Sequence, residues 1–141
     1  MNEKDFFEEP AGEYKKEKDF TSLFCWQDSR KMKLFFYNEV IPKLPSYEEG
    51  NLKSQMRRAA VSSTANIAEG YGRYNYQDST RFYRISRGST FELKDHLISC
   101  LDLKYIEKEV FDKGLILIED AKIKINGYIK YVQKLKKDQN K

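Results

Sequence analysis

The stretch QMRRAAVSSTANIAEGYGR, residues 55–73 of the 141-residue chain, decides the fold. It is rich in alanine and contains no proline, and its closing glycines, Gly70 and Gly72, are typical of a helix end. We therefore predict a helix over residues 51–71. At about 100° per residue, the side of this helix that faces a core consists of Leu52, Met56, Ala60, Ser63, Ile67 and Gly70.

The other sides of this helix are unusual for a solvent-facing surface. One side carries Gln55, Arg58, Ser62, Asn66, Glu69 and Arg73, and the next carries Arg57, Val61, Ala65 and Ala68. The last three are small and apolar where a monomeric bundle would expose lysine and glutamate. We therefore expect the helix to lie between its own bundle and a neighbouring subunit. The residues predicted to be structural or interfacial are Gln55, Val61, Ala65, Asn66, Ala68, Glu69, Gly88 and Phe91.

Two polar residues of the stretch, Asn66 and Glu69, are interpreted as structural. An unpaired buried carboxylate is costly, and Arg73 follows Glu69 by one helical turn, so an ion pair is favoured over acid–base chemistry. The GYG sequence does not form a dinucleotide-binding loop, because Asn75 stands where the third glycine belongs and no strand precedes it.

Three further helices are predicted, over residues 21–41, 77–103 and 107–135. Thr21 or Ser22 is the expected cap of the first, and Pro42 and Pro45 are expected to stop it. The last two show alternating steps of three and four, the spacing of helices that cross at a shallow angle. Their predicted core seams are Phe82, Ser86, Ser89, Leu93, His96, Cys100 and Leu103, and Phe111, Gly114, Ile118, Ala121, Ile125, Tyr128, Val132 and Leu135. The predicted fold class is an all-α, antiparallel up-down four-helix bundle.

Length and composition fit one globular domain, with 40% hydrophobic and 34% charged residues. There is no apolar run of membrane-spanning length and no signal-peptide pattern, so we expect a cytoplasmic protein without membrane contact. Cys25 and Cys100 are expected to be reduced thiols rather than a disulfide.

The net charge of +4 is unevenly distributed. Residues 1–19 contain seven acids and four lysines, a net of −3, which leaves +7 on the remainder. We predict that residues 1–19 form a disordered charged tail, with pairing to the basic body as the alternative. The bundle is assigned to residues 20–136 and a frayed basic C-terminus to residues 137–141. The lysines near that end suit either a nucleic-acid arm or a solvated helix end.

The chain resembles the four-helix bundle protein family, the intervening-sequence proteins of bacterial large-subunit (23S) ribosomal RNA. The resemblance is carried by Trp26 and Gln27, by the stretch over residues 55–73, and by FYRISRGSTFEL over residues 82–93. It implies an up-down bundle that assembles into a homopentamer and has no catalytic residues. A more distant similarity is to the accessory variability determinant of diversity-generating retroelements, which binds nucleic acid and a reverse transcriptase.

Arginines interleaved with aromatic residues are the candidate binding groups. Such a mixture supplies phosphate contacts and base stacking, and it is also common at protein interfaces. We predict a non-catalytic oligomer that binds nucleic acid, structured RNA in particular. The alternative is an adaptor for a polymerase or reverse transcriptase, whose arginines form subunit salt bridges without touching nucleic acid. The candidate nucleic-acid-binding residues are Arg57, Arg58, Arg73, Arg81, Arg84 and Arg87.

The sequence gives little support for a catalytic function. His96 is the only histidine and falls on a predicted core seam, so a di-iron site with two Glu-x-x-His motifs is excluded. The two cysteines lack metal-ligand spacing, and no base accompanies a serine nucleophile. We expect no enzyme activity, no cofactor and no metal.

Overall fold

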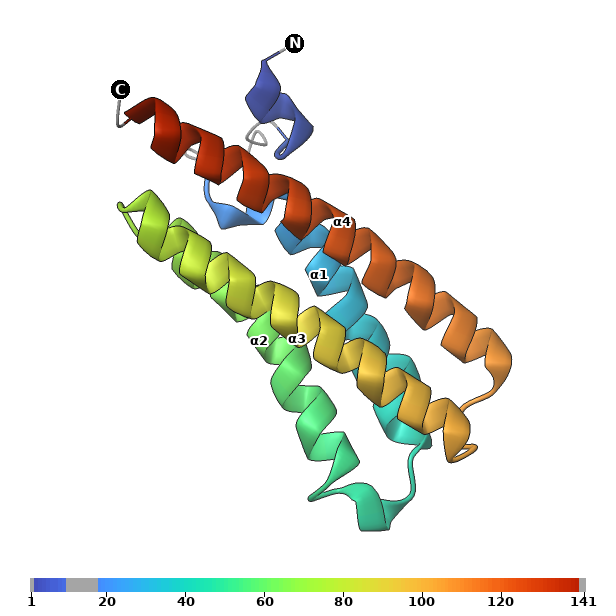
Figure 1. Cartoon of the computed structure of the whole chain (residues 1–141). Helices are drawn as coiled ribbons and strands as arrows, with labels where there is room; N and C mark the ends of the chain where they lie inside the picture. The colour runs from blue at the N-terminus through green and yellow to red at the C-terminus, as the bar shows by residue number, and fades with distance from the viewer. Residues whose placement is uncertain (1, 10–17, 140–141) are drawn as a thin grey trace.

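The computed structural model describes residues 2–9 and 18–139, and over these ranges its regular structure is helical (Figure 1). The four long helices are α1 (Phe24–Phe35), α2 (Leu52–Tyr71), α3 (Tyr76–Asp102) and α4 (Lys108–Gln139). Five short helical turns accompany them: η1 (Glu3–Phe6), η2 (Phe20–Ser22), η3 (Phe36–Val40), η4 (Ile41–Lys43) and η5 (Ser46–Glu48). The predicted all-α class and the four helices are therefore confirmed.

The side chains that link the helices show how they lie beside one another. Ser86 Oγ in α3 donates to the carbonyl of Ser63 in α2 at 2.6 Å. Arg87 of α3 contacts Asn126 of α4, and Gln77, ten residues earlier, contacts Lys136, ten residues later. α1 packs against both α2 and α4, so the four helices enclose one interior.

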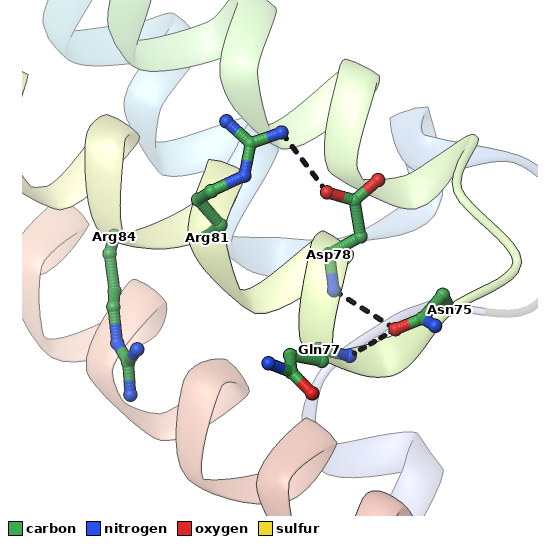
Figure 2. A pocket seen from close by; sticks show the side chains of 5 residues that line it. All are labelled: Asn75, Gln77, Asp78, Arg81 and Arg84. Atoms are coloured by element: carbon green, nitrogen blue, oxygen red, sulfur yellow. Dashed lines mark hydrogen bonds and ion pairs between the residues drawn. The ribbon is translucent and has the colours of Figure 1, made fainter.

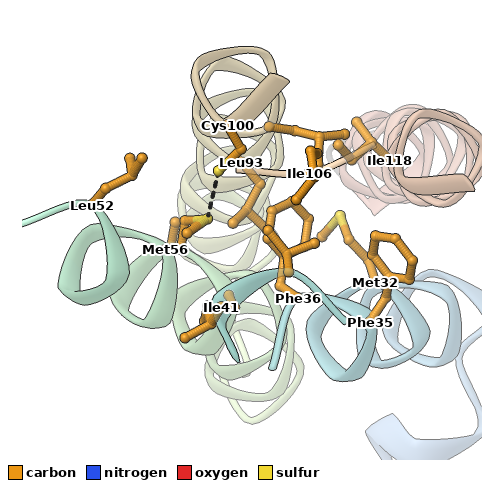
Figure 3. Packing of buried hydrophobic residues seen from close by; sticks show 14 of the residues in the cluster. Met32, Phe35, Phe36, Ile41, Leu52, Met56, Leu93, Cys100, Ile106 and Ile118 are labelled. Carbon is orange, nitrogen blue, oxygen red and sulfur yellow. Dashed lines mark hydrogen bonds between the residues drawn. The ribbon is translucent and has the colours of Figure 1, made fainter. Parts of the chain in front are cut away.

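The interior has two hydrophobic clusters, one toward each end of the bundle. The first contains Phe36, Met56 and Leu97 and is drawn in Figure 3. The second contains Ile67, Tyr83 and Tyr128, toward the end where α2 passes into α3. Burial of these side chains supplies the main stabilisation of the fold.

The core face predicted for α2 is correct. Leu52, Met56, Ala60, Ser63, Ile67 and Gly70 are all buried, together with Ala59 and Thr64. Small side chains let α2 and α3 approach closely: a Cβ added at Gly70 would lie 2.6 Å from the Tyr83 ring and 3.0 Å from the Ser79 carbonyl oxygen. Gly72 is the C-cap of α2, as the glycine pair predicted.

The core seam predicted for α3 is correct at Ser86, Leu93 and Cys100 and wrong at its other four residues. Phe82, Ser89 and His96 are only half-buried and Leu103 is exposed. The buried line also includes Tyr83, Thr90 and Leu97, which the prediction omitted. α3 packs against both α2 and α4, so its buried line points between two neighbours rather than toward one. The seam predicted for α4 is buried from Gly114 to Val132, with Phe111 and Leu135 half-buried at its ends.

The single helix predicted over residues 21–41 is divided in the structure among η2, α1, η3 and the start of η4. Asp19 caps the turn η2 through its side chain, and α1 begins after Leu23 without a side-chain cap, so neither Thr21 nor Ser22 caps it. α1 passes into the π-helical turn η3, which puts both Phe36 and Val40 in the core. Pro42 does not end this run abruptly but lies inside the next turn, η4.

Residues 2–9 are not a disordered tail, because they pack against the bundle. Phe7 stacks on Tyr131 of α4 with ring centroids 4.8 Å apart, and Glu8 is buried. One acid of the segment, Glu3, pairs with Lys134 of α4 at 3.2 Å. Residues 10–17 lie outside the described ranges. At the other end, α4 remains helical through Gln139, so residues 137–139 of the predicted frayed end are helical. Residues 140 and 141 also lie outside the described ranges.

We predict that both cysteine thiols resist alkylation in the folded protein. They are free and buried in different clusters, and burial raises the pKa of Cys25 and of Cys100 to about 12. At pH 8 the reactive thiolate is therefore almost absent, and we expect iodoacetamide to react about 1000-fold more slowly than in urea above the unfolding midpoint, because the thiolate fraction falls by about that factor when the pKa rises from 9 to about 12. Mass spectrometry of the alkylated chain measures both rates. Rapid labelling of either thiol in the native protein would contradict the packing described.

Candidate nucleic-acid interface

The six candidate arginines do not form one patch on the chain. Arg57 and Arg58 lie in the first half of α2, whereas Arg73 follows that helix and the other three lie in α3. Residues 58 and 73 are about 22 Å apart along the helix axis at about 1.5 Å per residue. The structure therefore separates one pair from the arginines at the α2–α3 end of the bundle.

Arg73 and Arg81 meet around the side chains of Asp78 and Phe82. Arg73 pairs with Glu69 at 2.6 Å, and Arg81 pairs with Asp78 at 3.0 Å. Both guanidinium groups also lie over the Phe82 ring, at 4.9 and 4.4 Å from its centroid. The predicted Glu69 ion pair is present, but Glu69 is exposed rather than buried. These two arginines are held in place by acids that partly offset their charge.

Arg84 is the arginine of this group that the structure leaves available. Figure 2 draws Arg84 together with Asn75, Gln77, Asp78 and Arg81, which line the same surface groove of about 540 Å³. Asn75 accepts the backbone N–H groups of Gln77 and Asp78 and so fixes the start of α3. Within the described ranges, Arg84 is exposed and makes no ion pair or hydrogen bond, so its charge is free to meet an anion.

α4 adds basic groups: the lysines near its C-terminal end, which the sequence analysis considered as a possible nucleic-acid arm, and Lys130, which it did not name. Lys130, Gln133, Lys134, Lys136 and Lys137 line a second groove of about 590 Å³. The contacts Arg87–Asn126 and Gln77–Lys136 define which residues of α3 and α4 lie opposite each other. By this pairing, Arg84 lies at the height of the α4 turn that contains Lys130. The spacing of Lys130, Lys134 and Lys137 by four and three is the signal that would have placed them on one helix face.

The remaining arginines have other surroundings. Arg87 is half-buried and donates to Asn126 Oδ1 at 2.9 Å, so it joins α3 to α4. Arg57 pairs with Glu49 at 2.8 Å, near the start of α2. Arg58 is exposed beside a smaller groove of about 270 Å³ that includes Gln55 and Ser89.

The residues predicted to be interfacial are mostly exposed on the single chain. Val61 is 48% exposed and Phe91 49%, while Gln55 and Ala65 are exposed and Ala68 is half-buried. Asn66 donates to the Ser62 carbonyl at 2.9 Å, as a structural residue would.

Gly88 has no close neighbour within its own chain. Apart from the backbone of its own helix, a Cβ added at Gly88 would meet no atom of the described residues within 4 Å. An exposed glycine inside a helix costs about 1 kcal/mol relative to alanine. Nothing within the described part of the bundle compensates for that cost.

No cluster of metal ligands occurs among the described residues. Groups of three or more histidine, cysteine, aspartate or glutamate side chains that could hold an ion are absent there. His96 has Glu92 at 3.2 Å as its neighbour one turn before it. None of the described helices is long and apolar enough to cross a membrane.

Comparison with known protein families gives a match over most of the chain. The family model described as 23S rRNA-intervening sequence protein matches residues 21–127. No curated protein matches the chain closely enough to serve as a relative. The match covers α1, α2, α3 and more than half of α4. The chain belongs to the 23S rRNA-intervening sequence protein family.

Proposed function

We propose that this protein binds structured RNA through the basic surface at the α2–α3 end of the bundle, without catalysing a reaction. The observation that carries the proposal is that Arg84 is exposed and unpaired within the described residues, at the level of Lys130 on the neighbouring α4. Family membership supports it, because the family takes its name from an insertion in ribosomal RNA. No cofactor or metal is part of the proposal.

Phosphate groups are the proposed ligands of this surface. Arg84 of α3 and Lys130 of α4 are two cationic side chains at similar heights along the bundle. Two such charges suit contacts with consecutive phosphates of a strand. Tyr74 is fully exposed in the connection between α2 and α3, where an unpaired base of a loop would stack on it. Structured RNA presents both features, a charged backbone and splayed bases.

We further propose that the antiparallel up-down bundle assembles into a homo-oligomer, a pentamer as the family resemblance implies, in the cytoplasm. The exposed apolar side chains of Val61 and Phe91 support an additional contact, since water-exposed apolar groups of this size favour burial. Gly88 would let a neighbouring backbone approach α3 closely. A ring of subunits would repeat the basic surface around the assembly.

The second candidate function is a protein adaptor that holds a polymerase or reverse transcriptase and does not touch nucleic acid. This candidate is supported by three large hydrophobic side chains that are exposed to solvent: Leu34 in α1, Tyr37 in η3 and Val61 in α2. The two candidates differ in salt dependence, because phosphate contacts weaken steeply with salt and apolar contacts do not.

The test is the variant Arg84→Glu, titrated against a labelled RNA hairpin by fluorescence anisotropy at several salt concentrations. We expect the affinity to fall about tenfold or more, because one phosphate contact is lost and a repulsive charge replaces it. Lys113→Glu is the matched control, since it makes the same charge change near the opposite end of α4. Its affinity should stay close to that of the wild type.

Sedimentation velocity on the same samples separates binding from assembly. The proposal expects Arg84→Glu to keep the oligomer of the wild type while losing RNA. If wild-type protein fails to bind the hairpin even at low salt, RNA binding is wrong and the adaptor function replaces it. If both variants weaken binding equally, net charge rather than this surface attracts the RNA.

A further inference from the structure

Residues 2–9, the N-terminal segment, lie along the C-terminal half of α4, on the flank of that helix away from α3 (Figure 1). Phe7 stacks on Tyr131 at 4.8 Å and meets Tyr128 edge-on at 6.0 Å. A Cβ added at Gly127 would lie 3.5 Å from the Phe7 ring, so the absence of a larger side chain there gives the ring room. An aromatic anchor therefore attaches the segment to one face of α4.

Backbone and charge contacts hold the same segment at its other side. The Phe24 N–H donates to the Phe7 carbonyl at 2.7 Å, and the Glu9 N–H donates to the Ser22 carbonyl at 3.0 Å. The Glu8 side chain is only 3% exposed, with the ammonium groups of Lys4 and Lys18 each at 3.3 Å. A buried carboxylate with two cations is a specific arrangement, so the segment is docked rather than loosely adsorbed.

The docked segment places a carboxylate at the lysine groove. Glu3 Oε2 lies 3.2 Å from Lys134 Nζ. On the α3 side of the groove, Lys136 contacts Gln77 at 3.2 Å. Between these two contacts, Lys130 and Lys137 are exposed and have no ion-pair partner among the described residues. The groove is thus a basic surface with one edge occupied by an acid of the same chain.

We propose that the lysine groove of α4 is a second contact site for a phosphodiester backbone, and that the N-terminal segment competes for it through Glu3. This inference rests on the proposed RNA binding and extends it from Arg84 and Lys130 to Lys134 and Lys137. The segment carries four acids and one lysine, so its field repels a polyanion near the groove while it stays docked. Undocking frees the Lys134 ammonium group from its ion pair with Glu3 and moves those acids away.

Competition of this kind lowers the apparent affinity by the fraction of molecules in which the groove is open. If the segment is docked in nine molecules of ten, its release strengthens binding by at most about tenfold, the value reached when docking prevents RNA binding altogether. Release also adds a phosphate contact at Lys134, so the slope of log affinity against log salt steepens by about one unit. These are two separate signatures of the same event.

The first arm of the test compares Phe7→Ala with Phe6→Ala in the full chain. Both remove one phenyl group from the segment, but Phe6 is 62% exposed and makes no ring contact among the described residues, whereas Phe7 is the anchor. We expect Phe7→Ala to bind the RNA hairpin about fivefold to tenfold more tightly than wild type. Phe6→Ala should bind as wild type does. Hydrogen exchange of residues 2–9 verifies that only Phe7→Ala undocks the segment.

The second arm changes charge without removing the anchor, and it keeps the test valid if Phe7→Ala unfolds part of the bundle. Glu3→Gln and Glu9→Gln remove the same charge from the same segment, but only Glu3 contacts a lysine of the groove. We expect Glu3→Gln to strengthen binding about twofold to threefold, and Glu9→Gln to change it much less. In the Phe7→Ala background, Lys134→Gln should remove the added salt-dependence.

The outcomes separate this inference from the function on which it rests. If RNA binds and Arg84→Glu weakens it, but Phe7→Ala matches Phe6→Ala and Glu3→Gln matches Glu9→Gln, competition by the segment is wrong and RNA binding stands. If no form of the protein binds RNA at low salt, the proposed function and the inference both fail.

Discussion

Replacing Phe36 by alanine should lower the free energy of unfolding by about 3–5 kcal/mol. Phe36 is fully buried, and it is the largest of the fully buried side chains among the described residues. It lies in the π-helical turn η3, next to Phe35, whose ring meets it at a near-right angle (Figure 3). Its removal loses both transfer free energy and packing contacts, because three surrounding helices limit how far the cavity can close.

Urea unfolding followed by circular dichroism measures this effect, with the midpoint expected to fall and the slope unchanged. Tyr37→Ala is the matched control, because Tyr37 is the next residue of the same turn and is exposed. The control should cost less than about 1 kcal/mol. A Phe36→Ala midpoint close to that of Tyr37→Ala would show that the turn does not place Phe36 in the core.

Replacing Gly70 by alanine should destabilise the protein by about 2–3 kcal/mol, although alanine is the better helix former. The added Cβ would lie 2.6 Å from Tyr83 Cε1 and 3.0 Å from the Ser79 carbonyl oxygen. Tyr83 is buried between α2 and α4, where its ring meets that of Tyr128 at 5.2 Å, so it has little room to move. The Ser79 oxygen belongs to helix backbone and cannot rotate away.

Gly72→Ala is the control for this prediction. It adds the same methyl group two residues later, where the nearest atom is the Glu69 carbonyl oxygen at an ordinary 3.5 Å. The φ angle of Gly72 is −74°, which alanine adopts without strain, so we expect no loss and a gain of up to about 1 kcal/mol. Thermal unfolding of both variants checks the contrast. Equal melting temperatures would mean that α2 and α3 are not in close contact at Gly70.

The faces of α2 and α4 were predictable because each helix turns one stripe toward the interior. Small and apolar residues recur there at helical spacing, from Leu52 to Gly70 and from Gly114 to Val132, and the periodicity reports burial directly. The ion pair of Glu69 with Arg73 was predictable for the same reason, since both residues belong to one turn of one helix.

The candidate site was predictable only in part. Arg84 was among the predicted residues, and its exposure agrees with a binding role. Lys130 was not, because its position beside Arg84 depends on the level at which α4 packs on α3. Arg87 was predicted to bind nucleic acid but donates to Asn126, and this contact joins residues 39 positions apart.

The sequence by itself determined the helical class, the four long helices and the family, because these depend on local spacing and on contiguous motifs. Only the tertiary structure decided the buried line of α3, the π-helical turn and the docking of residues 2–9. Each depends on a partner distant in sequence: α3 has helices on two sides, and Phe7 docks on Tyr131. Contacts of this kind produce no repeating pattern of residues in the local sequence, because they stabilise the protein only when elements distant in sequence pack together.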